Sequence, residues 1–196
     1  MIKIGLTGGI GTGKSYISLI FNAFNIPIYN SDIEAKKLYY NDNVKVEMKT
    51  NFGNNVYLST GEINKNFLSK LIFNDKNALE KINSIIHPRV KSHFSEWIKL
   101  NNTAHYIIKE SAILFESGAY KQTDKIIVVT APLDIRIKRI KARDNITEEI
   151  INKKINNQLS QSELIKNSDF IIVNDEKQAL LPQISKLHET FTNLNK

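Results

Sequence analysis

The chain contains no cysteine, and it contains no apolar run long enough to span a membrane. Without cysteine there are no disulfides, no thiolate metal ligands and no thiolate nucleophile, an absence that fits a reducing compartment. The N-terminus enters a strand-like stretch directly and carries no basic and apolar signal segment. Internal repeats, low-complexity tracts and flexible linkers are also missing. We therefore expect a folded cytoplasmic protein that does not associate with membranes.

The composition is ordinary apart from an excess of positive charge. Hydrophobic residues make up 41% and charged residues 24% of the 196 residues, and this length suits one domain with an appendage. The formal net charge is +7, which has two interpretations: a nucleic-acid-binding surface, or a pocket for polyanionic small molecules such as nucleotides. The charge alone does not choose between them.

The most informative segment is residues 8–15, which read GGIGTGKS and match the phosphate-loop spacing G-x-x-x-x-G-K-S. This segment follows an apolar stretch and runs into a helix-like one, as a loop between a strand and a helix requires. Glycines let successive N–H groups point inward, and the start of a helix adds partial positive charge. Lys14 is expected to reach the β- and γ-phosphates of ATP, and Ser15 to ligate Mg²⁺. The predicted nucleotide-binding residues are Gly8, Gly9, Ile10, Gly11, Thr12, Gly13, Lys14, Ser15, Tyr16 and Asn174.

The order of predicted elements indicates an α/β fold. Short apolar stretches, several of them rich in β-branched residues, predict strands at residues 1–6, 26–29, 105–108, 125–130 and 169–173. Helical spacing of apolar residues predicts helices at residues 14–24, 132–142 and 147–159 and from 180 onward. Strands separated by helices predict a five-stranded parallel sheet covered on both faces. The stretch 33–100 is helical almost throughout, with weak breaks near 41–43, 52–55 and 73–75, which indicates an inserted helical subdomain.

A phosphate loop alone does not identify the enzyme class. The chain has no Asn-Lys-x-Asp segment to read guanine, and no apolar run ends in a clean aspartate, since Ile107 and Ile108 lead to Lys109 and Glu110. A small-molecule kinase remains as the best class. Two rivals stay open: a kinase acting on another small hydroxyl acceptor, such as a nucleoside, nucleotide or shikimate-like molecule, and a basic nucleic-acid-binding protein switched by ATP. No helix-turn-helix or aromatic RNA-binding signature supports the second rival.

Three side chains are candidates for catalysis besides Lys14. Asp32 follows the second predicted strand, where its carboxylate would accept the proton of an attacking hydroxyl or would simply cap the next helix. Arg139 and Arg143 lie four residues apart, so a helix presents them on one face. Basic residues in such a stretch often form only a solvated surface, but in a lid their guanidinium groups would meet the transferring phosphoryl oxygens.

Several motifs resemble the dephospho-coenzyme A kinase family over almost the whole chain. They are GLTGGIGTGKS at residues 5–15, Ser31-Asp32, Ile86-His87-Pro88, Leu114-Phe115-Glu116, Gln158, and DFIIVN at residues 169–174. The resemblance implies transfer of the ATP γ-phosphate to the ribose 3′-hydroxyl of dephospho-coenzyme A, with Mg²⁺. It also implies a three-layer P-loop kinase whose core comprises residues 1–32, 104–137 and 161–196, with an acceptor-binding helical insertion at 33–103 and a lid at 138–160.

The resemblance also implies roles for individual residues. Asp32 matches the family's proposed general base, and His87 with Pro88 is expected to line the acceptor site. Glu116 falls on a family position, either near metal-bound water or in a structural hydrogen bond, and it is predicted to bind substrate. The expected partner is dephospho-coenzyme A, with no nucleic acid and no membrane. The expected state is a monomer, with a weak oligomer as the alternative. The departures from the usual family pattern are Tyr16, Asn30, Ala112 and Lys154.

Overall fold

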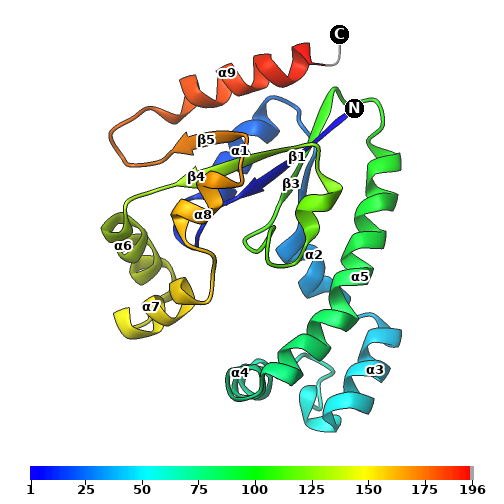
Figure 1. Cartoon of the computed structure of the whole chain (residues 1–196). Coiled ribbons are helices and arrows are strands. Elements are labelled where there is room, and N and C mark those ends of the chain that lie inside the picture. Colours follow the sequence, from blue (N-terminus) through cyan, green and yellow to red (C-terminus); the bar gives the residue numbers. More distant parts are fainter. Residues whose placement is uncertain (195–196) are drawn as a thin grey trace. The chain divides into compact units, whose positions relative to one another are not determined.

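The computed structural model describes residues 1–194, and for residues 73 and 74 it describes the backbone only. The chain forms two compact units: one comprises residues 1–30 and the chain from residue 101 onward, and the other comprises residues 31–100 (Figure 1). In residues 1–194, no helix is both long and apolar enough to cross a membrane.

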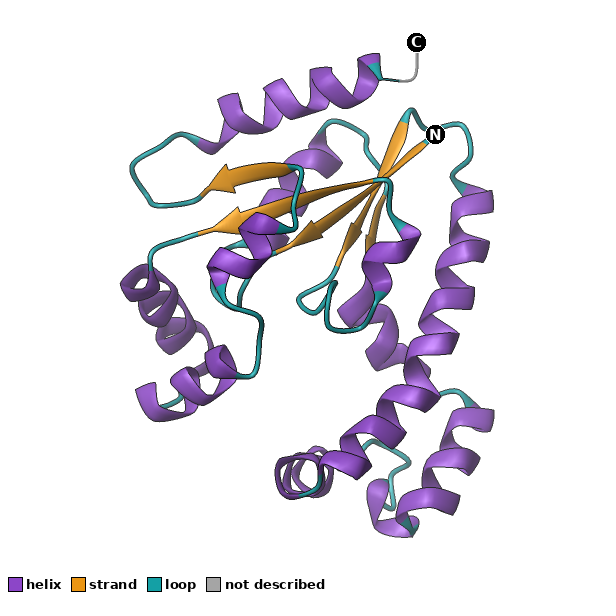
Figure 2. Cartoon of the chain, in the orientation of Figure 1, coloured by secondary structure: helices purple, strands orange, loops and turns teal. Residues whose placement is uncertain are grey.

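A single parallel sheet forms the centre of the first unit, and its strands fan out with a common twist (Figure 2). The strands are β1 (Ile2–Thr7), β2 (Ile28–Asn30), β3 (Tyr106–Glu110), β4 (Lys125–Thr130) and β5 (Phe170–Val173). They lie in the order β2-β3-β1-β4-β5, so β1 sits in the middle. The prediction of a five-stranded, all-parallel sheet is confirmed. Because all strands run in one direction, their carboxyl ends share one edge, where ligands of such sheets bind.

Helices cover both faces of this sheet. Helices α1 (Lys14–Ala23), α8 (Gln161–Lys166) and α9 (Leu180–Asn193) pack on its strands. The first unit also contains α6 (Leu133–Asp144) and α7 (Glu148–Asn156), which pack on each other, and a 3₁₀ turn η2 (Ala119–Gln122). On one face, Phe21 of α1 and Phe191 of α9 pack with Ile4 and Leu6 in the buried core. Successive side chains of a strand point to opposite faces. Gly5 accordingly faces the turn after β3, where an added Cβ would lie 2.7 Å from Leu114 Cδ2.

The second unit is a group of helices arranged around one long helix. Its elements are α2 (Ser31–Leu38), α3 (Asp42–Phe52), a 3₁₀ turn η1 (Asn54–Val56), α4 (Lys65–Asn74) and α5 (Lys76–Leu100). The other three α-helices of the unit all pack against α5. The apolar side chains Ile82, Ile85, Ile86 and Phe94 are buried along α5. Their spacing of three to four residues explains why this stretch folds as an amphipathic helix.

The structure corrects the sequence-based boundaries in two places. Residues 57–64 leave the helical pattern, and Tyr57 pairs with Ile63 in an isolated antiparallel bridge. The helix predicted at 147–159 ends at Asn156, and α8 follows after a capping box at Ser160. None of these changes affects the sheet.

Candidate active site

The phosphate loop joins the carboxyl end of β1 to the start of α1, as predicted. Gly11 and Gly13 have φ angles of 83° and 94°, which side chains other than glycine rarely adopt. A Cβ on Gly13 would collide with the side-chain amide of Asn174, so the loop needs glycine there for space as well. No side chain caps the N-terminus of α1. The partial positive charge at the start of this helix is therefore not offset by a capping side chain, which favours a bound anion there.

Lys14 is buried against the loop that it follows. Its Nζ donates to the carbonyl oxygens of Gly8, at 2.7 Å, and Gly9, at 3.3 Å. Only 8% of the residue is exposed to solvent. The ammonium group therefore lies across the phosphate loop, where the charge of a triphosphate would be concentrated.

Ser15 contacts a carboxylate that the sequence analysis did not select. Its Oγ donates to Glu110 Oε1 at 2.9 Å, while Glu110 Oε2 accepts from Ser18 Oγ at 2.8 Å and Asn30 Nδ2 at 2.9 Å. Glu110 is the last residue of β3, directly opposite Leu6 of β1, and it is only 3% exposed. The sequence analysis looked for an acidic residue directly after an apolar strand, as a metal site of this kind requires. It found none here, because Lys109 interrupts the apolar run. The structure places Glu110 in that position beside Ser15.

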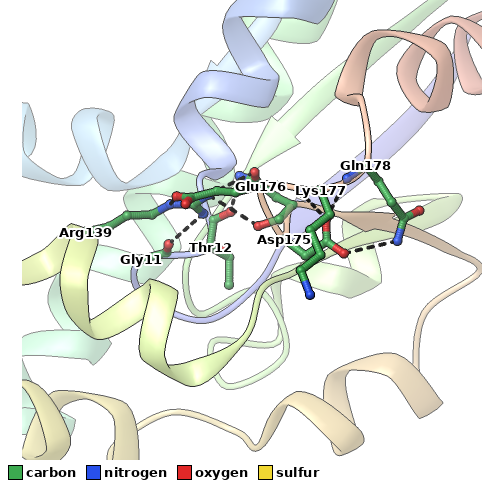
Figure 3. A network of polar contacts seen from close by, with 8 residues as sticks. Gly11, Thr12, Arg139, Asp175, Glu176, Lys177 and Gln178 are labelled. Carbon is green, nitrogen blue, oxygen red and sulfur yellow. Dashed lines mark hydrogen bonds and ion pairs between the residues drawn. The ribbon is translucent and has the colours of Figure 1, made fainter.

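Arg139 and Asn174 meet at the phosphate loop, although 34 residues separate them in the chain. Figure 3 shows Arg139 beside Gly11 and Glu176. Asn174 is buried, and its Nδ2 donates to Thr12 O at 2.8 Å. Arg139 Nη2 donates to Asn174 Oδ1 and to Glu176 Oε1, both at 3.1 Å, and Nη1 approaches Gly11 O at 3.5 Å. The structure therefore brings two predicted site residues onto the loop.

The loop after β5 is itself ordered by a carboxylate. Asp175 accepts hydrogen bonds from the backbone N–H groups of Lys177, at 3.0 Å, and Gln178, at 2.9 Å (Figure 3). These bonds lower the pKa of Asp175. The turn places Glu176 with a φ of 63°, beside the guanidinium of Arg139.

Arg143 does not lie on the phosphate loop in this structure. Its Nε and Nη2 bind the two carboxylate oxygens of Asp144 at 2.7 and 3.0 Å. This bidentate pair raises the pKa of Arg143 and lowers that of Asp144. Of the two predicted lid arginines, only Arg139 touches the loop.

Two side chains tie the predicted lid to the rest of the first unit. Gln158 Oε1 accepts from the N–H of Ile10 at 2.7 Å, and Gln158 Nε2 donates to Ala112 O at 3.1 Å. Glu116 Oε1 accepts from the N–H of Leu159 at 3.1 Å. Glu116 therefore makes a structural hydrogen bond, which is one of the two roles expected for it. Substrate binding by Glu116 stays a prediction.

The remaining predicted residues are Tyr16 in the first unit and Asp32, His87 and Pro88 in the second. Tyr16 is 60% exposed on α1. Asp32 is partly exposed in the first turn of α2, as the second residue of that helix and not its cap. His87 is partly exposed and Pro88 is exposed on α5, and burial lowers the pKa of His87. The neutral imidazole of His87 is therefore favoured.

The parallel sheet with a phosphate loop after its central strand defines a P-loop kinase fold. A shikimate kinase from Acinetobacter baumannii shares this fold, with a TM-score of 0.55 at 12% identity over 99% of this chain and 94% of that one. The likeness to a dephospho-CoA kinase from Campylobacter jejuni is greater, with a TM-score of 0.73 at 25% identity over 99% and 98% of the two chains. A protein from Thermus thermophilus gives a TM-score of 0.82 at 25% identity, covering 98% and 97%.

Sequence comparison narrows the class to one family. A family model described as dephospho-CoA kinase matches residues 2–179. A dephospho-CoA kinase from Bacteroides fragilis is 41% identical over 95% of this chain and 91% of that protein. One from Fusobacterium nucleatum is 37% identical over 95% and 97% of the two chains. The chain belongs to the dephospho-CoA kinase family.

Proposed function

We propose that this protein is a dephospho-CoA kinase that transfers the γ-phosphate of ATP to the ribose 3′-hydroxyl of dephospho-CoA. The observation that carries the proposal is the family match, which spans residues 2–179 and so includes the phosphate loop, the helical unit and the predicted lid. Membership of this kinase family makes ATP the phosphate donor. The phosphate-loop geometry supports the same assignment, because the ammonium group of Lys14 lies on the loop and no side chain caps the start of α1.

The residues beside the loop fit a bound Mg²⁺. Magnesium prefers oxygen ligands, keeps several waters, and is usually held by one or two protein groups together with substrate phosphates. Ser15 Oγ and the carboxylate of Glu110, 2.9 Å apart, supply oxygens of this kind. Residues 1–194 contain no cluster of three or more acidic or histidine side chains that would hold a metal alone, which suits an ion that shares its ligands with ATP. When bound, Mg²⁺ neutralises charge on the phosphates.

Phosphoryl transfer depends mainly on positioning and on stabilisation of spread negative charge. Lys14 binds the terminal phosphates, and Arg139 is the lid arginine placed to act on the nucleotide, since it already lies against Gly11. Arg143 contributes only after Asp144 releases it. Closure of the lid segment 138–160 excludes water from the transferring group.

The acceptor side of the site is assigned to the helical unit together with Glu116 of the first unit. Asp32 accepts the proton of the 3′-hydroxyl as general base, and the family resemblance supports this role over that of a helix cap. His87, Pro88 and Glu116 contact dephospho-CoA in this proposal. A neutral His87 suits hydrogen bonding to an uncharged acceptor group. We further propose that the protein acts as a monomer in the cytoplasm.

The function is tested with the purified protein, ATP, Mg²⁺ and a panel of acceptors. Dephospho-CoA should give coenzyme A and ADP in equal amounts, as measured by liquid chromatography. Shikimate, nucleosides and nucleotides should give turnover at least about a hundredfold lower. If another acceptor is phosphorylated faster than dephospho-CoA, that acceptor and not dephospho-CoA is the substrate. ATP binding without any turnover, coupled to salt-dependent binding of RNA or DNA, would favour the nucleic-acid alternative.

A further inference from the structure

Arg136 is a buried arginine that packs against the outside of the phosphate loop. It lies in the first turns of α6, is 7% exposed, and its Nε donates to Ile10 O at 2.9 Å. The guanidinium occupies the space that a side chain on Gly9 would need, since an added Cβ there would lie 2.8 Å from Arg136 Cζ. The sequence analysis had no reason to separate Arg136 from the other basic residues of this helix.

The charge of Arg136 has no carboxylate partner in residues 1–194, whereas its neighbours on α6 do. Arg139 pairs with Glu176 at 3.1 Å and Arg143 pairs with Asp144 at 2.7 Å. A single carbonyl oxygen is the hydrogen-bond acceptor for Arg136 among the described residues. Burial without a counter-charge is costly and lowers the pKa of the guanidinium. A polyanion on the adjacent loop would offset that cost.

The position of Arg136 also fixes the orientation of a loop peptide. The N–H of Ile10 donates to Gln158 Oε1 at 2.7 Å, and its C=O accepts from Arg136 Nε at 2.9 Å. In a planar trans peptide, the C=O of one residue and the N–H of the next point in opposite directions. Holding the Ile10 carbonyl outward on Arg136 therefore directs the N–H of Gly11 to the other side, toward the interior of the loop.

We propose that Arg136 is a positioning residue for ATP: it orients the Gly11 N–H and adds a positive charge behind the loop that favours the bound triphosphate. This inference rests on the proposed function only in naming ATP as the bound nucleotide. Arg136 acts through the loop backbone and takes no proton and no phosphoryl group.

The test compares three variants with the wild-type protein by calorimetric titration with ATP and Mg²⁺ and by thermal unfolding without nucleotide. Arg136→Gln removes the charge but keeps a donor for Ile10 O, whereas Arg136→Lys keeps the charge. Lys138→Gln is the control, because Lys138 is an exposed residue of the same helix and the charge change is the same. Dephospho-CoA is titrated in parallel as a ligand whose site does not include the loop.

Arg136→Gln should weaken ATP binding about tenfold, as expected for loss of a charge-assisted interaction, and Arg136→Lys by clearly less. Binding of dephospho-CoA should change by less than about twofold, and the unfolding temperature without nucleotide should stay the same or rise, because a costly buried charge is gone. Lys138→Gln should match the wild type. Unchanged ATP affinity in Arg136→Gln would overturn the proposal. So would a lower unfolding temperature together with equal losses of affinity for ATP and dephospho-CoA. ATP binding is measured without turnover, so a failure of the proposed function is recognised separately.

Discussion

The two units of the molecule differ in what they bury. Among the described side chains, ten buried polar or charged residues belong to the first unit, and only Ser31 belongs to the helical unit. Buried polar groups are costly unless they are hydrogen-bonded, so such a concentration indicates a specialised site. Lys14, Glu110, Arg136 and Asn174 are in this set, and all four contact the phosphate loop or Ser15 just after it.

The helical unit buries almost only apolar side chains. Its buried positions on α5 are apolar, and the side chains with predicted roles, Asp32 and His87, are partly exposed. Charged and polar side chains are thus buried in the first unit, whereas the helical unit has an apolar interior and carries the side chains with predicted roles at its surface. Substitutions in the two units should therefore change different measured quantities, namely ATP binding, turnover or the free energy of unfolding.

The largest effect is expected from Asp32→Asn, because this surface group of the helical unit is assigned to the chemical step. We expect kcat to fall on the order of 10³-fold, the usual range for a general base, while the Kd for ATP changes less than about twofold. Steady-state kinetics and calorimetry measure the two quantities. Glu34→Gln, in the same helical turn, is the matched control. A kcat near the wild-type value would remove Asp32 from the mechanism.

Lys14→Met, a substitution in the first unit, should reduce both ATP binding and turnover. The substitution keeps an unbranched side chain of nearly the same length but removes the ammonium group that contacts Gly8 and Gly9. We expect kcat/KM for ATP to fall by several hundredfold. An assay of ADP formation measures this loss, and far-UV circular dichroism should show an unchanged fold. If the loss is less than about tenfold, the loop does not hold the phosphates as described.

The two lid arginines should differ in importance. Arg139 already contacts the loop, whereas Arg143 is held by Asp144, so we expect Arg139→Ala to reduce kcat/KM about 10²-fold and Arg143→Ala by no more than about tenfold. Parallel kinetics on the two variants tests the order. A reversed order would mean that lid closure exchanges the partners of these arginines.

Glu110→Gln should raise the Mg²⁺ requirement. The carboxylate accepts bonds from Ser15, Ser18 and Asn30, and an amide nitrogen in its place would face those donors. A loss of about 10- to 100-fold in metal affinity is usual for such a change near a metal ligand. Activity is titrated with Mg²⁺ for the wild type and the variant, and chelation with EDTA should abolish turnover in both. An unchanged Mg²⁺ midpoint would assign Glu110 to the fold alone.

The smallest effect on ATP is expected from Ile85→Ala in the apolar frame of the helical unit. Ile85 is 1% exposed, and truncation of a buried isoleucine costs about 3 kcal/mol of folding free energy. Urea unfolding measures this loss, and the Kd for ATP should remain within about twofold of the wild-type value, because the nucleotide site belongs to the other unit. A large loss of ATP affinity in a folded variant would contradict the assignment of ATP binding to the first unit alone.

Much of this architecture could be predicted from the sequence. The loop motif lies between a strand and a helix as predicted, and short apolar stretches gave the five strands. The sequence also selected Arg139 and Asn174, which the structure places on the loop. Local patterns succeed here because buried parallel strands are short apolar runs and the helices carry apolar residues at helical spacing.

Other features depend on contacts between distant segments, which local patterns do not encode. Arg136 was indistinguishable from Lys138 and Lys141, because only the packing of α6 against the loop decides which basic residue faces Ile10. Glu110 was set aside because Lys109 breaks the apolar run, although Lys109 is buried with its amine 2.7 Å from Gln122 Oε1.

One missed element did leave a local signal. The short helix α8 begins at a capping box in which Ser160 and Glu163 bond each other's backbone N–H groups, and this pair is visible in the sequence. Its six-residue length hid it from a periodicity search. The bridge between Tyr57 and Ile63 left no comparable signal, because it spans a turn with a single pairing.

The most direct test of the account follows the label from γ-³²P-ATP into dephospho-CoA. The account predicts that the labelled product is coenzyme A and that a 3′-nucleotidase releases all of its label as phosphate. Label at any other position of the acceptor, or no label in the acceptor while ATP is bound, would contradict it.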